Sequence, residues 1–158
     1  MSFENAKNHL KKYGLEDRIR EFSVSSATVK EAAAALHCKE GEIAKTLSFL
    51  VEDNPILIVV AGDVKIDNSK YKSTFHKKAK MIPFDEVESF IGHSVGGVCP
   101  FGIHDGVKVY LDQSLQKYEF VYPACGSSNS AVKLTIKELE DASNYSKWID
   151  VCKEEVLM

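Results

Sequence analysis

Lys45 is the first residue of the chain whose type and position could serve chemistry. It stands where a predicted helical turn gives way to an apolar strand. A cation held at such a junction could bind a phosphate group or polarise a carbonyl oxygen. A lysine at the same place could also point into water, and its surroundings in the sequence leave both uses open.

A glycine-rich segment at residues 96–102, Gly-Gly-Val-Cys-Pro-Phe-Gly, is the second candidate. Paired glycines let the backbone approach a ligand closely. Pro100 removes one N–H donor and stiffens the segment, so the remaining N–H groups could face an anion or a developing oxyanion. The alternative is a tight turn between a helix and a strand.

A third segment, residues 125–130, is small and rich in hydroxyl groups. Such loops bind anions, but they are also common as turns between two strands. The sequence alone leaves both uses open.

The cysteines and histidines form no clear catalytic or metal-binding pattern. Cys99 could pair with His93 or His104 as nucleophile and base, but no acid is placed to complete a triad, which favours a buried, inert Cys99. The four cysteines are widely spaced, and these two histidines are not spaced like zinc ligands. No phosphate-binding or dinucleotide motif is present. The sequence therefore predicts no metal and no cofactor.

The charge of the chain is unevenly distributed. The net charge of −3 at pH 7 would not attract nucleic acid to the molecule as a whole. Residues 65–80 nevertheless carry six lysines and one acidic residue. Such a strip could bind a phosphate backbone, and the candidates are Lys70, Lys72, Lys77 and Lys78. The alternative is a solvated, lysine-rich helix.

Hydropathy and cysteine content indicate a cytoplasmic protein. No apolar run approaches the roughly 18 residues of a membrane span, and the polar N-terminus is unlike a signal peptide. We therefore expect reduced cysteines without disulfides. Neither a membrane nor DNA is an expected partner.

The elements that must position these residues follow two periodicities. Helical spacing and capping signals predict helices near 2–13, 29–36, 67–76 and 85–91, and one that begins after Thr135. Alternating or continuous apolar runs predict strands at 45–51, 56–61, 80–82, 107–111, 120–122 and 131–136. The first two strands should form a hairpin. Together these elements predict a single α+β domain, residues 1–158, with a mixed, mostly antiparallel sheet and helices outside.

Several of these segments occur together in an order that resembles the YbaK/ProX family of aminoacyl-tRNA deacylases. They are residues 43–49, Ala61-Gly62-Asp63, the loop at 96–102 and Gly126-Ser127-Ser128, and the similarity extends over residues 29–139. Family members are free-standing editing factors, or insertions in prolyl-tRNA synthetase, that remove a wrong amino acid from tRNA. The resemblance implies a strongly curved mixed sheet surrounded by helices.

The resemblance also implies roles for individual residues. Lys45 matches the family's functionally required lysine. Gly96 and Pro100 match a Gly-x-x-x-Pro loop whose backbone faces the aminoacyl ester, and Gly126 and Ser127 match a glycine loop near the same pocket. In this family the ribose hydroxyl beside the ester is expected to assist hydrolysis, which agrees with the lack of a triad.

We therefore expect hydrolysis of the 3′-terminal aminoacyl ester of mischarged tRNA, either tRNA(Pro) or a related tRNA that carries cysteine, alanine, serine or threonine. N–H groups near Gly97 and Val98 would stabilise the oxyanion. The predicted catalytic residues are Lys45, Gly96, Gly97 and Val98, and the predicted substrate-binding residues are Ser25, Thr28, Thr46, Cys99, Pro100, Gly126, Ser127 and Ser128. The expected partners are the tRNA acceptor end, which the lysine strip would contact, and an aminoacyl-tRNA synthetase. The alternative is a non-catalytic tRNA-binding or synthetase-associated module of the same fold.

Overall fold

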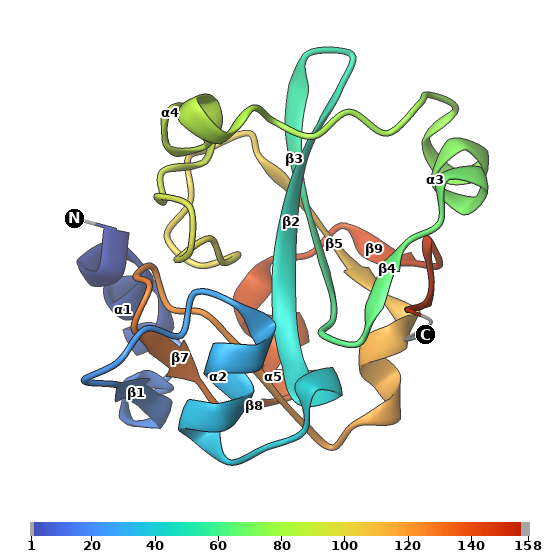
Figure 1. The fold of residues 1–158 in the computed structure, drawn as a ribbon. Coiled ribbons are helices and arrows are strands. Elements are labelled where there is room, and N and C mark those ends of the chain that lie inside the picture. The colour runs from blue at the N-terminus through green and yellow to red at the C-terminus, as the bar shows by residue number, and fades with distance from the viewer. Residues whose placement is uncertain (1, 156–158) are drawn as a thin grey trace.

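A six-stranded mixed sheet forms the centre of the molecule, with helices around it (Figure 1). The computed structural model describes residues 2–155, so both ends of the predicted domain at 1–158 lie outside the described residues. The strands lie in the order β8-β6-β2-β3-β5-β9. Their bounds are β2 Ile43–Val51, β3 Asn54–Ala61, β5 Lys108–Asp112, β6 Phe120–Pro123, β8 Leu134–Thr135 and β9 Lys147–Ile149.

The strands of the structure pair in both parallel and antiparallel ladders. The ladders β2–β6, β3–β5 and β5–β9 are parallel, and β2–β3 and β6–β8 are antiparallel. Two small antiparallel sheets flank the main one, and they pair β1 Ile19–Glu21 with β7 Ser130–Val132, and β4 Val64–Ile66 with β10 Cys152–Glu154. The expected α+β fold with a curved mixed sheet is therefore confirmed (Figure 1).

The β2–β3 hairpin is the longest element of the fold, and it confirms the predicted strand pair. Glu52 and Asp53 have φ values of 50° and 67°, as a two-residue hairpin turn of the primed type requires. The register pairs Lys45 with Val60. Residues 57–61 of β3 are fully buried, which agrees with their continuous apolar run and with a strand covered on both faces.

The five α-helices begin and end close to the predicted positions. Capping boxes at Thr28–Glu31 and Thr135–Glu138 form as expected and open α2 and α5. No helix within residues 2–155 is long and apolar enough to cross a membrane. The bounds are α1 Ser2–Lys11, α2 Val29–Leu36, α3 Asn68–Phe75, α4 Val87–Ile91 and α5 Ile136–Ser143.

Three local predictions were wrong. The helix predicted at 85–91 begins only at Val87, because a 3₁₀ turn at Phe84–Glu86 precedes it. The strand predicted at 80–82 is reduced to a single bridge between Met81 and Phe49. The strand predicted at 131–136 divides into β7 and β8, which pair with different partners.

Candidate functional site

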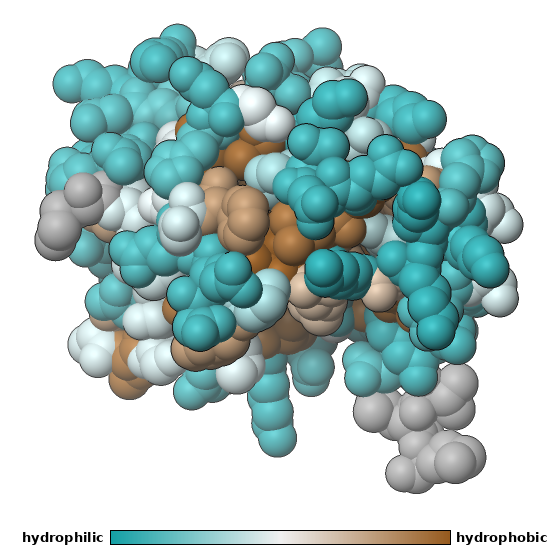
Figure 2. Space-filling model, turned by 90° about the horizontal axis from the view of Figure 1, so that it is seen from above, coloured by the Kyte–Doolittle hydropathy of each residue, from teal (hydrophilic) through white to brown (hydrophobic). Residues whose placement is uncertain are grey.

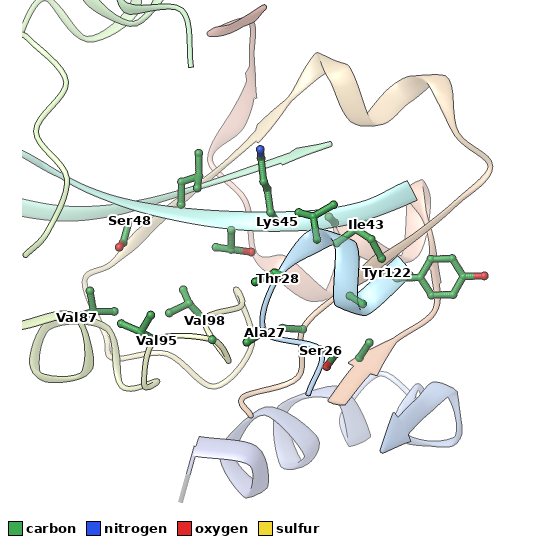
Figure 3. A pocket seen from close by; sticks show the side chains of 18 of the residues that line it. Ser26, Ala27, Thr28, Ile43, Lys45, Ser48, Val87, Val95, Val98 and Tyr122 are labelled. Atoms are coloured by element: carbon green, nitrogen blue, oxygen red, sulfur yellow. The ribbon is translucent and has the colours of Figure 1, made fainter. Parts of the chain in front are cut away.

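A pocket of about 420 Å³ lies beside β2, between the N-terminus of α2 and the loop that follows α4 (Figure 3). Of the predicted site residues, Thr28, Lys45, Thr46, Gly96 and Val98 line it. Most of the remaining lining is apolar, so the pocket offers few polar groups, each in a defined place. Such a pocket is typical of a small-ligand site.

The pocket opens on an edge of β2 that is covered at both ends and bare in the middle. β6 pairs with the beginning of the strand. Near its end, the Leu50 N–H donates to the Lys80 carbonyl at 2.8 Å, and the Ser48 carbonyl accepts from the Ile82 N–H at 3.1 Å. Because alternate residues of a strand direct their N–H and C=O groups to the same edge, those of Thr46 face the gap. Among residues 2–155 neither group has a backbone partner.

The N-terminal end of α2 forms one wall of the pocket. The Thr28 hydroxyl accepts a bond from the Glu31 N–H at 3.1 Å, so the capping box fixes Thr28 at the pocket. The serine that lines this wall of the pocket is Ser26, whose N–H donates to the Ser128 carbonyl at 2.6 Å. The predicted Ser25 is exposed and bonds to Glu31 instead, so its expected place is taken by its neighbour.

The loop after α4 forms the opposite wall, and the 126–128 segment supports it from behind. The Gly126 N–H donates to the Gly97 carbonyl at 3.0 Å. A Cβ on Gly97 would lie 2.5 Å from the carbonyl carbon of Gly126 and the nitrogen of Ser127, so only glycine allows this approach. Gly126, Ser127 and Ser128 therefore hold the loop rather than line the pocket.

The two loop N–H groups predicted to stabilise the oxyanion differ in whether they already have a hydrogen-bond acceptor. The Gly97 N–H donates to the Ser94 carbonyl at 3.0 Å, which closes a turn and occupies one of the two predicted oxyanion donors. The Val98 N–H has no acceptor among residues 2–155, and the Val98 side chain lines the pocket (Figure 3). Of the two predicted oxyanion donors, Val98 is therefore the one that remains free for a ligand.

The comparisons with known proteins agree with this geometry. The model of the aminoacyl-tRNA editing domain family matches residues 24–142. The chain belongs to this family. The editing domain is 49% identical to the uncharacterised protein YwhH of Bacillus subtilis (strain 168), over 98% of this chain and 99% of that one.

Two further similarities are to proteins whose names refer to prolyl-tRNA synthesis. The editing domain is 31% identical to proline–tRNA ligase of the same Bacillus strain over 56% of this chain, which spans only 16% of the ligase. A solved structure described as a candidate trans-editing enzyme for prolyl-tRNA synthetase superposes with a TM-score of 0.86 and 28% identity, and the match covers 98% of both chains. The resemblance inferred from the sequence is thereby confirmed.

Lys45 lies at the rim of the pocket of the editing domain. Its side chain leaves β2 on the side away from Ser26, Ala27 and Val98 (Figure 3). Its amine donates to the Val64 carbonyl at 2.5 Å, so the stem lines the pocket and the charge is held at the edge. In this conformation the amine is turned away from the part of the pocket that Ser26, Ala27 and Val98 line (Figure 3).

Cys99 and Pro100 do not line this pocket, contrary to their predicted contact with substrate. Cys99 is fully buried, and burial raises the pKa of its thiol. Both residues belong to the loop at 96–102 and are buried. Within residues 2–155 no three histidine, cysteine or acidic side chains are grouped so that they could hold a metal ion.

An apolar rim surrounds the mouth of the pocket, and the sequence did not indicate it. Phe84, Met81 and Val95 line the pocket although their exposed fractions are 78%, 56% and 43%. Figure 2 views the molecule from the side over which the segment from α3 to α4 crosses the hairpin, and it shows hydrophobic surface in a recess among hydrophilic side chains. The only sequence signal was a phenylalanine directly after Pro83 in a segment without apolar periodicity.

Some lysines of the strip at residues 65–80 form bonds or ion pairs with other parts of the fold. Lys70 bonds to Asp150 at 3.1 Å and to the Cys152 carbonyl, and Lys77 lies 3.4 Å from Glu52. The exposed lysines Lys72 and Lys78 form no ion pair within residues 2–155. The chain runs from this strip across the hairpin to the pocket rim (Figure 1), so the strip and the pocket are joined by one continuous surface segment.

Proposed function

We propose that the editing domain hydrolyses the 3′-terminal aminoacyl ester of mischarged tRNA, and that the tRNA is tRNA(Pro) or a related one. The observation that carries this proposal is the position of free backbone groups at the pocket: the Thr46 N–H and C=O on the bare edge of β2, and the Val98 N–H opposite. Membership of the editing family and the similarity to prolyl-tRNA ligases support the choice of substrate.

In the proposed reaction, water attacks the carbonyl carbon of the ester. The negative charge that develops on the carbonyl oxygen is stabilised by N–H groups already in place, of which Val98 supplies one. Collapse of the tetrahedral intermediate breaks the bond to the ribose oxygen, which takes up a proton. The adjacent ribose hydroxyl assists this transfer, so no side-chain nucleophile is required.

The mouth of the pocket carries side chains that could bind the terminal base and a phosphate of the tRNA. A single-stranded base stacks on exposed aromatic side chains, and each such contact contributes about 1–3 kcal/mol. Phe84 is the exposed aromatic residue at the rim, so we assign it to the terminal adenine. Lys45 would exchange its bond to Val64 for a terminal phosphate, and prolyl-tRNA synthetase is the proposed partner in the cytoplasm.

A deacylation panel tests this function. The protein is incubated with tRNAs in which the tRNA and the attached amino acid are varied independently, and release of the amino acid is followed. Hydrolysis above the rate in buffer for at least one small amino acid is expected. Binding of tRNA with no hydrolysis across the panel would instead indicate a non-catalytic module.

The variant Lys45→Ala tests the role assigned to the Lys45 amine. We expect at least a tenfold loss in kcat/KM, because a phosphate contact or a contact to the developing charge is removed. Lys108→Ala is the control, since Lys108 is an exposed lysine on β5 that does not line the pocket. Full activity of Lys45→Ala would contradict the assigned role.

A further inference from the structure

Thr46 lines the pocket and carries a buried hydroxyl without a partner. Its Oγ1 is inaccessible to solvent and forms no hydrogen bond with any group of residues 2–155. Thr46 lines the pocket together with Ser48, and residues two apart on a strand share one face. Figure 3 shows the Ser48 hydroxyl on the pocket side of β2. Ser48 is 7% exposed.

Three other hydroxyls around the pocket are already engaged. The Ser26 hydroxyl donates to the Ser128 carbonyl, and the Thr28 hydroxyl belongs to the capping box. The hydroxyl of Ser130 pairs with that of Ser127. The hydroxyls of Thr46 and Ser48 both lack a partner within residues 2–155, but only that of Thr46 is also shielded from solvent, and a buried hydroxyl without a partner is costly to maintain.

The walls around Thr46 limit what can satisfy it. Ala32, Ile43, Ala44 and Val98 line the pocket with apolar groups, and the one charged side chain in the lining, Lys45, is held at the rim. A small uncharged side chain that carries its own hydroxyl fits this environment. A methyl group or a thiol would leave Oγ1 without an equivalent bond.

We propose that the pocket selects a β-hydroxy amino acid, serine or threonine, over alanine and cysteine, and that Thr46 Oγ1, turned toward the pocket about the Cα–Cβ bond, binds the side-chain hydroxyl. This inference rests on the proposed deacylase function. The α-ammonium group of the aminoacyl ester has a separate acceptor in the Thr46 carbonyl, which faces the bare edge of β2. The hydroxyl therefore stays available for the side chain.

The test compares four substrates, the same tRNA charged with serine, threonine, alanine or cysteine. The wild type is expected to hydrolyse the serine or threonine ester at least tenfold faster, in kcat/KM, than the alanine and cysteine esters, because sites that bind a substrate hydroxyl discriminate strongly against analogues without it. Thr46→Val keeps the shape and removes the hydroxyl. It should lose the preference, so that the serine and threonine esters are hydrolysed no faster than the alanine ester.

Thr74→Val is the matched control, because the Thr74 hydroxyl bonds within α3 to the Lys70 carbonyl, away from the pocket. It should keep the wild-type preference. An equal loss for all four substrates in Thr46→Val would overturn the proposal, since Thr46 would then bind a group that all of them share. A wild-type preference for alanine or cysteine would overturn it as well.

A binding experiment tests selection by Thr46 independently of whether the protein hydrolyses the ester. Non-hydrolysable 3′-seryl-amino and 3′-alanyl-amino adenosine are titrated into wild type and Thr46→Val by calorimetry. Tighter binding of the seryl compound to the wild type, lost in the variant, would support selection by Thr46 even if no ester is hydrolysed. Equal affinities, or no binding of either compound, would overturn it.

Discussion

The Sγ atom of Cys99 lies 3.5 Å from Nε2 of His93, but that nitrogen is already bonded to the Phe101 carbonyl at 2.6 Å. Because a carbonyl oxygen can only accept, Nε2 must carry the hydrogen and cannot take the thiol proton. Burial lowers the pKa of His93 and raises the pKa of Cys99, so both side chains stay neutral. Cys99 and His93 therefore cannot act as a nucleophile and its general base.

Cys99→Ala should therefore retain deacylase activity. The buried thiol is replaced by a smaller group, and we expect a loss of about 1–2 kcal/mol in the free energy of unfolding. The kcat/KM on mischarged tRNA should remain within about threefold of wild type. Loss of activity in a variant that unfolds at the expected urea concentration would show that the thiol takes part in the reaction.

Gly97→Ala should damage the pocket wall. Its Cβ would meet the backbone of Gly126 and Ser127 at 2.5 Å, and backbone atoms cannot move aside as a side-chain end can. We expect a loss of about 1–3 kcal/mol in stability and of most of the activity. Gly14→Ala is the control, because no atom lies within 4 Å of its Cβ and only its φ of +71° is unfavourable. It should lose stability but keep activity per folded molecule.

The hairpin could be predicted from the sequence because its signal is local. Leu47, Phe49 and Val51 alternate along β2, and β3 is a continuous apolar run. The parallel partners of the hairpin could not be predicted in this way, because their pairing depends on residues that are far apart in the chain. β9 is the clearest example, since Trp148 is only partly buried and its strand lies in a weakly patterned segment.

The same distinction between local and non-local signals applies to the residues of the candidate site. Strand phase placed Thr46 and the capping box placed Thr28, and both lie at the pocket. Ser25 was predicted where Ser26 lines the pocket, because neither lies in a regular element with a periodicity to indicate which one turns inward. The availability of the Val98 N–H depends on a turn closed by neighbouring residues, which no spacing of residue types reveals.

Lys72→Ala combined with Lys78→Ala should weaken tRNA binding. Both lysines are exposed, and a phosphate contact from each would release about one counterion. The slope of log affinity against log salt should therefore fall by about two for the double variant. Lys133→Ala is a suitable control, because Lys133 lies over the Phe120 ring, away from the strip. An unchanged affinity and slope would remove the strip from the tRNA interface.

Glu138→Gln tests an electrostatic contribution to stability. Glu138 accepts bonds from the Thr135 N–H at 2.9 Å and from Arg18 at 2.8 Å. Partial burial opposes its ionisation, but these bonds outweigh it and lower the pKa of the carboxyl. The charge therefore stabilises the fold fully above the ordinary pKa of about 4.3, and this stabilisation is lost as the pH falls through the lower folded value.

The variant keeps an oxygen for the capping box, so only the charge is removed. At pH 7 the wild type should be more stable by up to about 1 kcal/mol, and the difference should shrink as the pH is lowered from 5 to 3. Urea unfolding at pH 7, 5, 4 and 3 measures it, with the exposed Glu119→Gln as control. A difference that stays constant or grows toward low pH would contradict the assignment, because the charged form would then not be the one that Arg18 and Thr135 favour.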